Sequence, residues 1–262
     1  MKSSRILIGI SLLLAGCASH TVFVALEEMP VASLTDSCDP VVMADTAAGY
    51  CHYATSLSQQ LAAFKLAQEA YLAMPENPHI AMTLSRCAYF ASELADDKEI
   101  SYQLIRKGME ASWKAGADKK DPAAAFYYGV FWGQMIRKKG LTALGKLPEL
   151  EGVFSAALKH PETEHGGPFR ALGMLYLKAP AWPRSIGDLE KSLELLERGT
   201  VEFPNFPLNH FFYAQALVED ESFEDAEHHL QLAEKLVDAG DFGAFGDRWT
   251  GDIKAFRAKI GD

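Results

Sequence analysis

The sequence predicts an all-α protein made of antiparallel helix pairs that stack in succession along the chain. From residue 44 onward, apolar residues recur at spacings of three and four, as at Leu189, Leu193 and Leu196. Such spacing places them on one face of a helix. Prolines interrupt these stretches about every forty residues, a period typical of repeated helix pairs. No stretch alternates apolar and polar residues over the length of a sheet strand.

The recurring prolines indicate where helices begin. A proline in the first helical turn loses no hydrogen bond, because the N–H that it lacks has no partner at that position. The sequence therefore predicts a helix beginning at each of four prolines, Pro78, Pro122, Pro168 and Pro207.

Small residues recur where paired helices are expected to cross. Gly173 follows Leu172 in one expected helix, and Ala226 lies in another. Small side chains let two helices approach closely, while large ones fill the groove beside them. The pattern resembles the tetratricopeptide repeat (TPR), in a degenerate form because residues 178–187 form an insertion. The resemblance implies a degenerate TPR-like solenoid over residues 44–262.

The N-terminal residues have the pattern of a secretory signal. Lys2 and Arg5 precede an apolar run of about ten residues, which is too short to cross a bilayer core of ~30 Å as a helix. The run ends in Leu-Ala-Gly-Cys at Cys17, which resembles the lipobox of bacterial lipoproteins. The resemblance implies that residues 1–16 are a signal peptide and that the Cys17 thiol carries a diacylglycerol. An ordinary secretory signal with an incidental cysteine is the alternative.

A lipid anchor sets the expected compartment and the limits of the folded domain. Ala18 after the cysteine resembles lipoproteins sorted to the outer membrane, so we expect a periplasm-facing protein that contacts the membrane through its acyl chains. Residues 17–43 contain two prolines and no helical period, and we interpret them as a tether. The helical-repeat domain then covers residues 44–262.

Three cysteines remain once Cys17 is lipidated. Thiols can pair in an oxidising compartment, but three of them form at most one disulfide. The sequence leaves two pairings open, Cys51 with Cys87 and Cys38 with Cys51. It equally allows three reduced thiols, two of which pack between helices.

Charge and motifs argue against several classes of function. The net charge of −10 argues against nucleic-acid binding, which requires a basic face. The chain has no Gly-rich phosphate loop, no His-Glu-x-x-His and no Gly-x-Ser-x-Gly. His228 and His229 are adjacent and therefore point to different faces of a helix. We expect a binding protein that is not an enzyme and holds no metal and no cofactor.

An ordered set of short motifs spans residues 122–235. It comprises Ala-Phe-Tyr-Tyr-Gly at 125–129, Lys-Gly-Leu at 139–141, Leu-Pro-Glu-Leu at 147–150, Phe-Ser-Ala-Ala-Leu at 154–158, Gly-Gly-Pro-Phe-Arg-Ala-Leu-Gly at 166–173, Leu-Lys-Ala-Pro at 177–180 and Gly-Asp at 187–188. In order and spacing these motifs resemble the T-component family of TRAP transporters, the TatT-like lipoproteins. The chain departs from that family at Ile186, where the family has a glycine.

The resemblance implies a periplasmic helical-repeat lipoprotein that serves a TRAP-type transport system. It also implies a homotrimer, association with a periplasmic solute-binding protein and a role in moving small hydrophobic ligands. A TPR adaptor or scaffold lipoprotein in cell-envelope assembly is the alternative function.

Aromatic residues in the helix expected after Pro122 are candidates for contacting a ligand or partner. Tyr128, Phe131 and Trp132 share one face, and Tyr127 and Gln134 lie on the neighbouring face. The first face either packs against the next helix or lines a pocket for an apolar ligand or a partner's helix. In a pocket, Tyr127 and Gln134 would supply hydrogen bonds.

Charged and polar residues give further candidates. Arg137 begins a basic run at the end of the same helix, where cations either offset the helix dipole or bind a carboxylate. Arg170 opposes the dipole of its own helix, so it either pairs with an acidic neighbour or faces an anionic ligand or partner. Trp182, between two prolines, either packs over the next helix or forms a partner contact. Asn209 and His210 lie early in a helix, at positions that often face the concave side of helical-repeat proteins.

Overall fold

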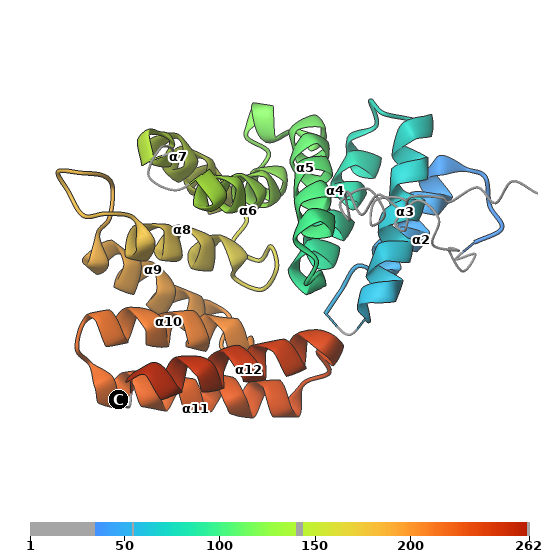
Figure 1. Ribbon diagram of the computed structural model, residues 1–262. Helices are drawn as coiled ribbons and strands as arrows, with labels where there is room; N and C mark the ends of the chain where they lie inside the picture. Colours follow the sequence, from blue (N-terminus) through green and yellow to red (C-terminus); the bar gives the residue numbers. More distant parts are fainter. Residues whose placement is uncertain (1–34, 54, 140–143, 261–262) are drawn as a thin grey trace, which may run out of the picture. The chain divides into compact units, whose positions relative to one another are not determined.

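The structure, a computed structural model, describes residues 35–260 except 54 and 140–143, and in these ranges the fold is all-α (Figure 1). Eleven α-helices and one short 3-10 helix follow one another there, and successive helices pack as antiparallel pairs. The helices are α2 (Pro40–Tyr50), α3 (Leu57–Ala73), α4 (Pro78–Leu94), α5 (Lys98–Ala115), η1 (Ala117–Lys119), α6 (Pro122–Lys139), α7 (Leu147–Ala157), α8 (Gly167–Lys178), α9 (Leu189–Glu202), α10 (Pro207–Glu219), α11 (Phe223–Ala239) and α12 (Gly243–Ile260).

The four predicted helix starts are confirmed. Proline occupies the first or second position of α4, α6, α8 and α10. Side-chain caps complete two other starts: the Asp39 carboxylate accepts backbone N–H groups of α2 and the Asp97 carboxylate those of α5, which satisfies donors that lack a helical partner. The first described helix therefore begins at Pro40, before the expected start at residue 44.

Close helix crossings depend on glycine. A Cβ placed on Gly173 of α8 would lie 2.6 Å from Cγ of Leu196 in α9, and one on Gly129 of α6 would lie 2.5 Å from the Phe154 ring in α7. Both distances are shorter than real Cβ contacts, so a larger residue at either position would displace the Leu196 or Phe154 side chain, or the helix that carries it. The predicted role of small residues at helix crossings is confirmed at Gly173.

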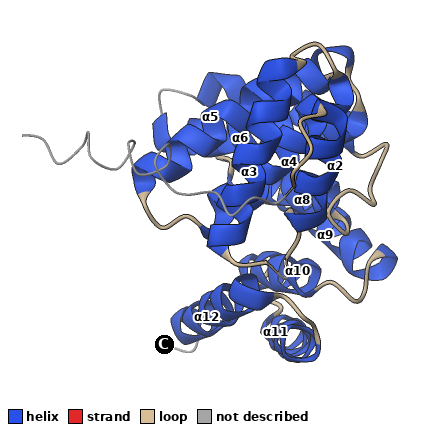
Figure 2. Cartoon of the chain, turned by 90° about the vertical axis from the view of Figure 1, so that its right-hand side faces the viewer, coloured by secondary structure: helices blue, strands red, loops and turns tan. Residues whose placement is uncertain are grey.

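Helices α10, α11 and α12 lie side by side, with α10 packed on both α9 and α11 (Figure 2). An aromatic cluster ties α12 to the segment that follows α2. The Tyr53 ring centroid lies 5.2 Å from that of Trp249 in α12 and 5.3 Å from that of Phe206, just before α10. Aromatic rings at these separations contribute beyond the area that they bury.

Cys51, directly after α2, forms a disulfide with Cys87 of α4, and their Cα atoms are 5.0 Å apart. Cys38 is a free, exposed thiol. The structure thus selects the first of the two pairings that the sequence left open. A structural disulfide is consistent with an oxidising compartment. Cys17 and the signal segment lie outside the described residues, and none of the described helices is long and apolar enough to cross a membrane.

Candidate functional site

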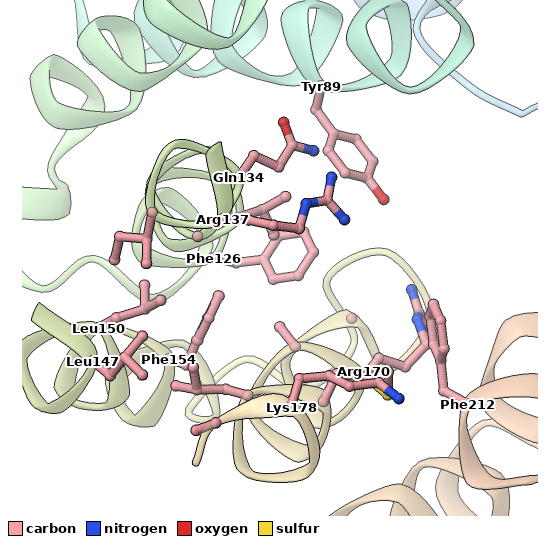
Figure 3. A pocket seen from close by; sticks show the side chains of 18 of the residues that line it. Tyr89, Phe126, Gln134, Arg137, Leu147, Leu150, Phe154, Arg170, Lys178 and Phe212 are labelled. Atoms are coloured by element: carbon pink, nitrogen blue, oxygen red, sulfur yellow. The ribbon is translucent and has the colours of Figure 1, made fainter. Parts of the chain in front are cut away.

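A cavity of about 710 Å³ lies between α6, α7 and α8, with α4 and α10 contributing to its edges (Figure 3). Its volume falls within the roughly 300–1,000 Å³ of small-molecule sites. Apolar side chains make up most of its walls: Phe126, Val130, Ile136, Leu144, Leu147, Leu150, Phe154, Met174, Leu175, Leu208 and Phe212.

Helical periodicity brings these walls together. In α6 the lining residues Phe126, Val130, Gly133 and Arg137 follow one another at spacings of three and four, so they share one face of the helix. Lining residues in α8, from Arg170 through Met174 to Lys178, follow the same period. Two helix faces therefore confront each other across the cavity.

Two polar side chains, Gln134 and Glu93, lie at the α4 edge of the cavity. Gln134 Nε2 donates to Glu93 Oε1 at 2.8 Å, while Gln134 Oε1 is buried and meets no donor among the described residues. Burial raises the pKa of the Glu93 carboxyl, an effect opposed by the positive charges of Arg248 and Arg137. The Gln134 amide oxygen is thus available to accept a hydrogen bond from a ligand.

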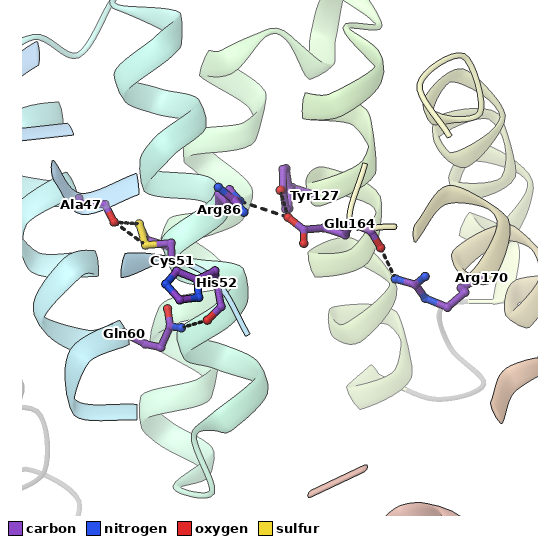
Figure 4. Close-up of polar contacts among 9 residues, drawn as sticks. Ala47, Cys51, His52, Gln60, Arg86, Tyr127, Glu164 and Arg170 are labelled. Atoms are coloured by element: carbon purple, nitrogen blue, oxygen red, sulfur yellow. Dashed lines mark hydrogen bonds and ion pairs between the residues drawn. A yellow bond between two sulfur atoms is a disulfide. The ribbon is translucent and has the colours of Figure 1, made fainter. Parts of the chain in front are cut away.

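The buried carboxylate of Glu164, whose backbone carbonyl accepts from Arg170, joins α4 to α6 (Figure 4). Glu164 Oε1 accepts from the Tyr127 hydroxyl at 2.5 Å and from Arg86 Nε at 3.2 Å. Burial and the Glu164 charge both raise the pKa of the Tyr127 phenol, so it stays protonated as a donor. The Tyr127 hydroxyl, which the sequence offered as a donor to a ligand if its helix lined a pocket, instead donates to Glu164 inside the protein.

Arg170 is buried and donates to three oxygens. Its guanidinium bonds the backbone carbonyls of Glu164 and His165 and the Asn209 side-chain oxygen, each at 2.7 Å. The guanidinium carbon also lies 4.6 Å from the centroid of the Phe206 ring. Arg170 lines the cavity, yet its main polar partners are carbonyl oxygens, and no described carboxylate forms an ion pair with it.

The turn before α8 explains why these carbonyls converge on Arg170. Glu164, His165 and Gly166 all have positive φ, at 47°, 54° and 87°. Left-handed backbone is costly for residues other than glycine, and here it directs two successive carbonyls at one guanidinium. Sequence reasoning missed Glu164 and Arg86, because only the Gly-Gly pair after Glu164 indicated a turn.

Asn209 and His210 are also buried. Asn209 donates to the carbonyls of His165 and Phe203. His210 Nε2 lies 2.8 Å from the Pro204 carbonyl and must donate to it, so its Nδ1 accepts from His229 Nδ1 at 2.9 Å. Burial, together with His210, lowers the pKa of His229 to about 4.

The candidate aromatic residues separate into two environments. Phe131 is fully buried, as is Tyr127 apart from 4% of its surface. Tyr128 and Trp132 are half-buried, and the Tyr128 ring contacts Trp113 in a second cavity of about 400 Å³. None of these four residues lines the larger cavity, whereas Gln134 does.

Trp182 is 84% exposed in the described structure. Its loop is closed by backbone hydrogen bonds from Gly187 N to the Pro180 carbonyl and from Arg184 N to the Ala181 carbonyl. Of the two alternatives for this residue, packing over the next helix is therefore not observed.

No model of a known protein family and no curated protein matches the chain. Within the described ranges, no group of three His, Cys, Asp or Glu side chains is arranged to hold a metal ion. The site is thus defined by its own geometry: an apolar cavity between three helices, with polar groups at its edges.

Proposed function

We propose that this chain is a periplasmic binding lipoprotein, anchored in the outer membrane through Cys17, whose degenerate TPR-like solenoid binds a small apolar ligand. It would serve a TRAP-type transport system together with a periplasmic solute-binding protein. The observation that carries the proposal is the cavity between α6, α7 and α8, with its largely apolar walls.

The cavity favours a small apolar ligand on physical grounds. Each Å² of apolar surface removed from water contributes about 25 cal/mol, and the walls offer aliphatic and aromatic carbon from five helices. The few polar groups at the edges are of the kind that orient a ligand in such sites.

Two further features support the family and the compartment. The motifs that resemble the T-component family fall largely on α6, α7 and α8, the helices that enclose the cavity. The Cys51–Cys87 disulfide agrees with an oxidising periplasm. The solute-binding partner and the homotrimer rest on the sequence resemblance.

Filling the cavity tests the proposal. Ala171 lines it from α8, so Ala171→Phe should occupy the space of the ligand. In a Cys17→Ser background, which prevents acylation, we expect the chain to bind the neutral probe N-phenyl-1-naphthylamine and Ala171→Phe to weaken that binding at least about tenfold, the equivalent of ~1.4 kcal/mol.

The matched control is Leu72→Phe, which adds a ring at a position that is 71% exposed and does not line the cavity. It should bind the probe as the parent does. Equal probe binding by the parent and Ala171→Phe, with both folded by circular dichroism, would show that the cavity is not the ligand site.

A second candidate is a TPR adaptor lipoprotein in cell-envelope assembly, which Trp182 favours. A tryptophan 84% exposed on a loop closed by backbone hydrogen bonds is the kind of side chain that anchors a protein interface. Capture of partners from periplasmic extract by the parent and by Trp182→Ala separates the candidates. Trp182-dependent capture of envelope-assembly proteins supports the adaptor, whereas capture of one solute-binding protein supports the transport accessory.

A further inference from the structure

The cavity carries positive charge at its exposed edge, although the chain as a whole has a net charge of −10. Arg137 near the end of α6 and Lys178 at the end of α8 both line the cavity and are both exposed. Its interior walls are apolar. A cavity with apolar walls and cations at its solvent edge matches a ligand that is itself apolar at one end and anionic at the other.

Arg137 and Arg170 differ in what they bind. The donors of Arg170 are occupied by two carbonyls and the Asn209 side chain. Arg137, in contrast, makes no hydrogen bond or ion pair with another described residue. Figure 3 shows its guanidinium extending from α6 toward Tyr89. Arg137 therefore has donors to offer a ligand, whereas Arg170 has a structural role.

Among the described residues that line the cavity, Glu93 is the one acidic side chain, and both its carboxylate and its backbone carbonyl already accept hydrogen bonds. Its carboxylate accepts from the Gln134 amide, and its backbone carbonyl accepts from Arg248. It forms no ion pair within 4 Å with Arg137 in the described structure. Of the described residues that line the cavity, three are cations and one is a carboxylate, so the described lining is positive overall.

We infer that the ligand of this cavity is an apolar monocarboxylate, whose carboxylate is bound by Arg137 and whose tail lies against Leu147, Leu150 and Phe154. The inference rests on the proposed function and adds the class of ligand to it. An arginine presents a planar pair of donors that fits a carboxylate, and such charge-assisted bonds are stronger than neutral ones. Lys178 lines the cavity from the end of α8 and adds a second exposed positive charge.

The test compares three ligands with one tail: decanoate, decanol and decyltrimethylammonium, titrated into the Cys17→Ser chain by calorimetry. We expect decanoate to bind at least about tenfold more tightly than decanol, and the cation to bind most weakly. Arg137→Gln should weaken decanoate binding about tenfold, the equivalent of ~1.4 kcal/mol, and leave decanol binding unchanged. Arg184→Gln is the matched control, since Arg184 is exposed and does not line the cavity.

The outcomes separate this inference from the proposed function. If decanol binds as tightly as decanoate, or if Arg137→Gln weakens both ligands equally, the role of Arg137 is overturned while an apolar ligand site remains. Preference for the cationic ligand overturns the inference as well. If neither these ligands nor the neutral naphthylamine probe bind, the proposed function itself fails.

Discussion

Glu164 is the residue at which the contacts of several helices converge. Its carboxylate accepts from Tyr127 of α6 and Arg86 of α4, and its backbone carbonyl accepts from Arg170 of α8. The side chain is only 5% exposed, and a buried carboxylate is tolerated only when it is paired and hydrogen-bonded. This residue therefore holds α4, α6 and the start of α8 in register beside the cavity.

Glu164→Gln tests that role. The amide keeps the shape but loses the charge that Arg86 and Tyr127 bind, and it buries N–H donors where the site offers donors already. Hydrogen bonds to charged groups contribute about 1.5–3 kcal/mol, so we expect the free energy of unfolding in urea to fall by about 2 kcal/mol. Glu162→Gln, at a carboxylate 63% exposed in the same turn, should leave the free energy of unfolding close to that of the parent, because solvent screens an exposed charge. Equal effects of the two substitutions would contradict the role of Glu164.

Helix α6 shows how one element serves the core and the cavity at once. Phe126, Val130 and Arg137 face the cavity, whereas Phe131 points to the interior and meets Gly108 of α5. The largest rings were the natural candidates for a ligand site. Phe131 is fully enclosed, where a ring removes most apolar surface from water, while Tyr128 and Trp132 are half-buried outside the cavity. The cavity face carries Phe126 together with the smaller Val130 and Gly133, which leave space.

Helix spacing is tested by paired glycine substitutions. A Cβ on Gly173 would lie 2.6 Å from Leu196, whereas one on Gly152 of α7 would meet nothing within 4 Å. We expect Gly173→Ala to lower the free energy of unfolding by about 1–3 kcal/mol, because the added methyl group overpacks the contact between α8 and α9. Gly152→Ala should raise it by about 0.5–1 kcal/mol, because alanine loses less backbone entropy in a helix. If Gly173→Ala is neutral, α8 and α9 do not approach as closely as described.

At the scale of the whole molecule, one disulfide and one set of aromatic contacts connect the first described helices to other parts of the fold. The Cys51–Cys87 disulfide joins the end of α2 to α4, and Tyr53 packs between Phe90 of α4 and Trp249 of α12. Residues close to the start of the described chain thus contact its last helix. Packing between successive helices alone would not bring the segment after α2 into contact with α12, and the Tyr53 contacts do so.

Removing the disulfide measures its contribution. Its cysteines are 36 residues apart, and the loss of chain entropy in the unfolded state for a loop of this size corresponds to about 3–4 kcal/mol. We expect the double substitution Cys51→Ser and Cys87→Ser to lower the free energy of unfolding by about 2–4 kcal/mol. Cys38→Ser, at the free thiol, should leave it unchanged. A drop for Cys38→Ser equal to that of the double variant would point to a different pairing in solution.

The sequence by itself determined the all-α class and where the helices begin at Pro78, Pro122, Pro168 and Pro207. These features depend on chemistry within one helical turn, namely the missing proline N–H and the apolar spacing. It also indicated Gly173 as a position of close helix contact, and it offered Gln134 as a hydrogen-bonding group only if the helix after Pro122 lined a pocket. It did not separate buried rings from rings at a surface, because both follow the same helical period.

Only the tertiary structure decided which cysteines pair, which side chains surround the cavity and what Arg170 binds. Each depends on distances between residues that lie far apart in the chain: 36 positions for the disulfide, 39 for Arg170 and Asn209, and 41 for Glu93 and Gln134 of the cavity lining. The positive φ at Glu164 and His165 is likewise held by these contacts, since neither residue favours it on its own. Helix packing therefore separates Arg170, whose donors are filled within the protein, from Arg137, which reaches the cavity from the end of α6.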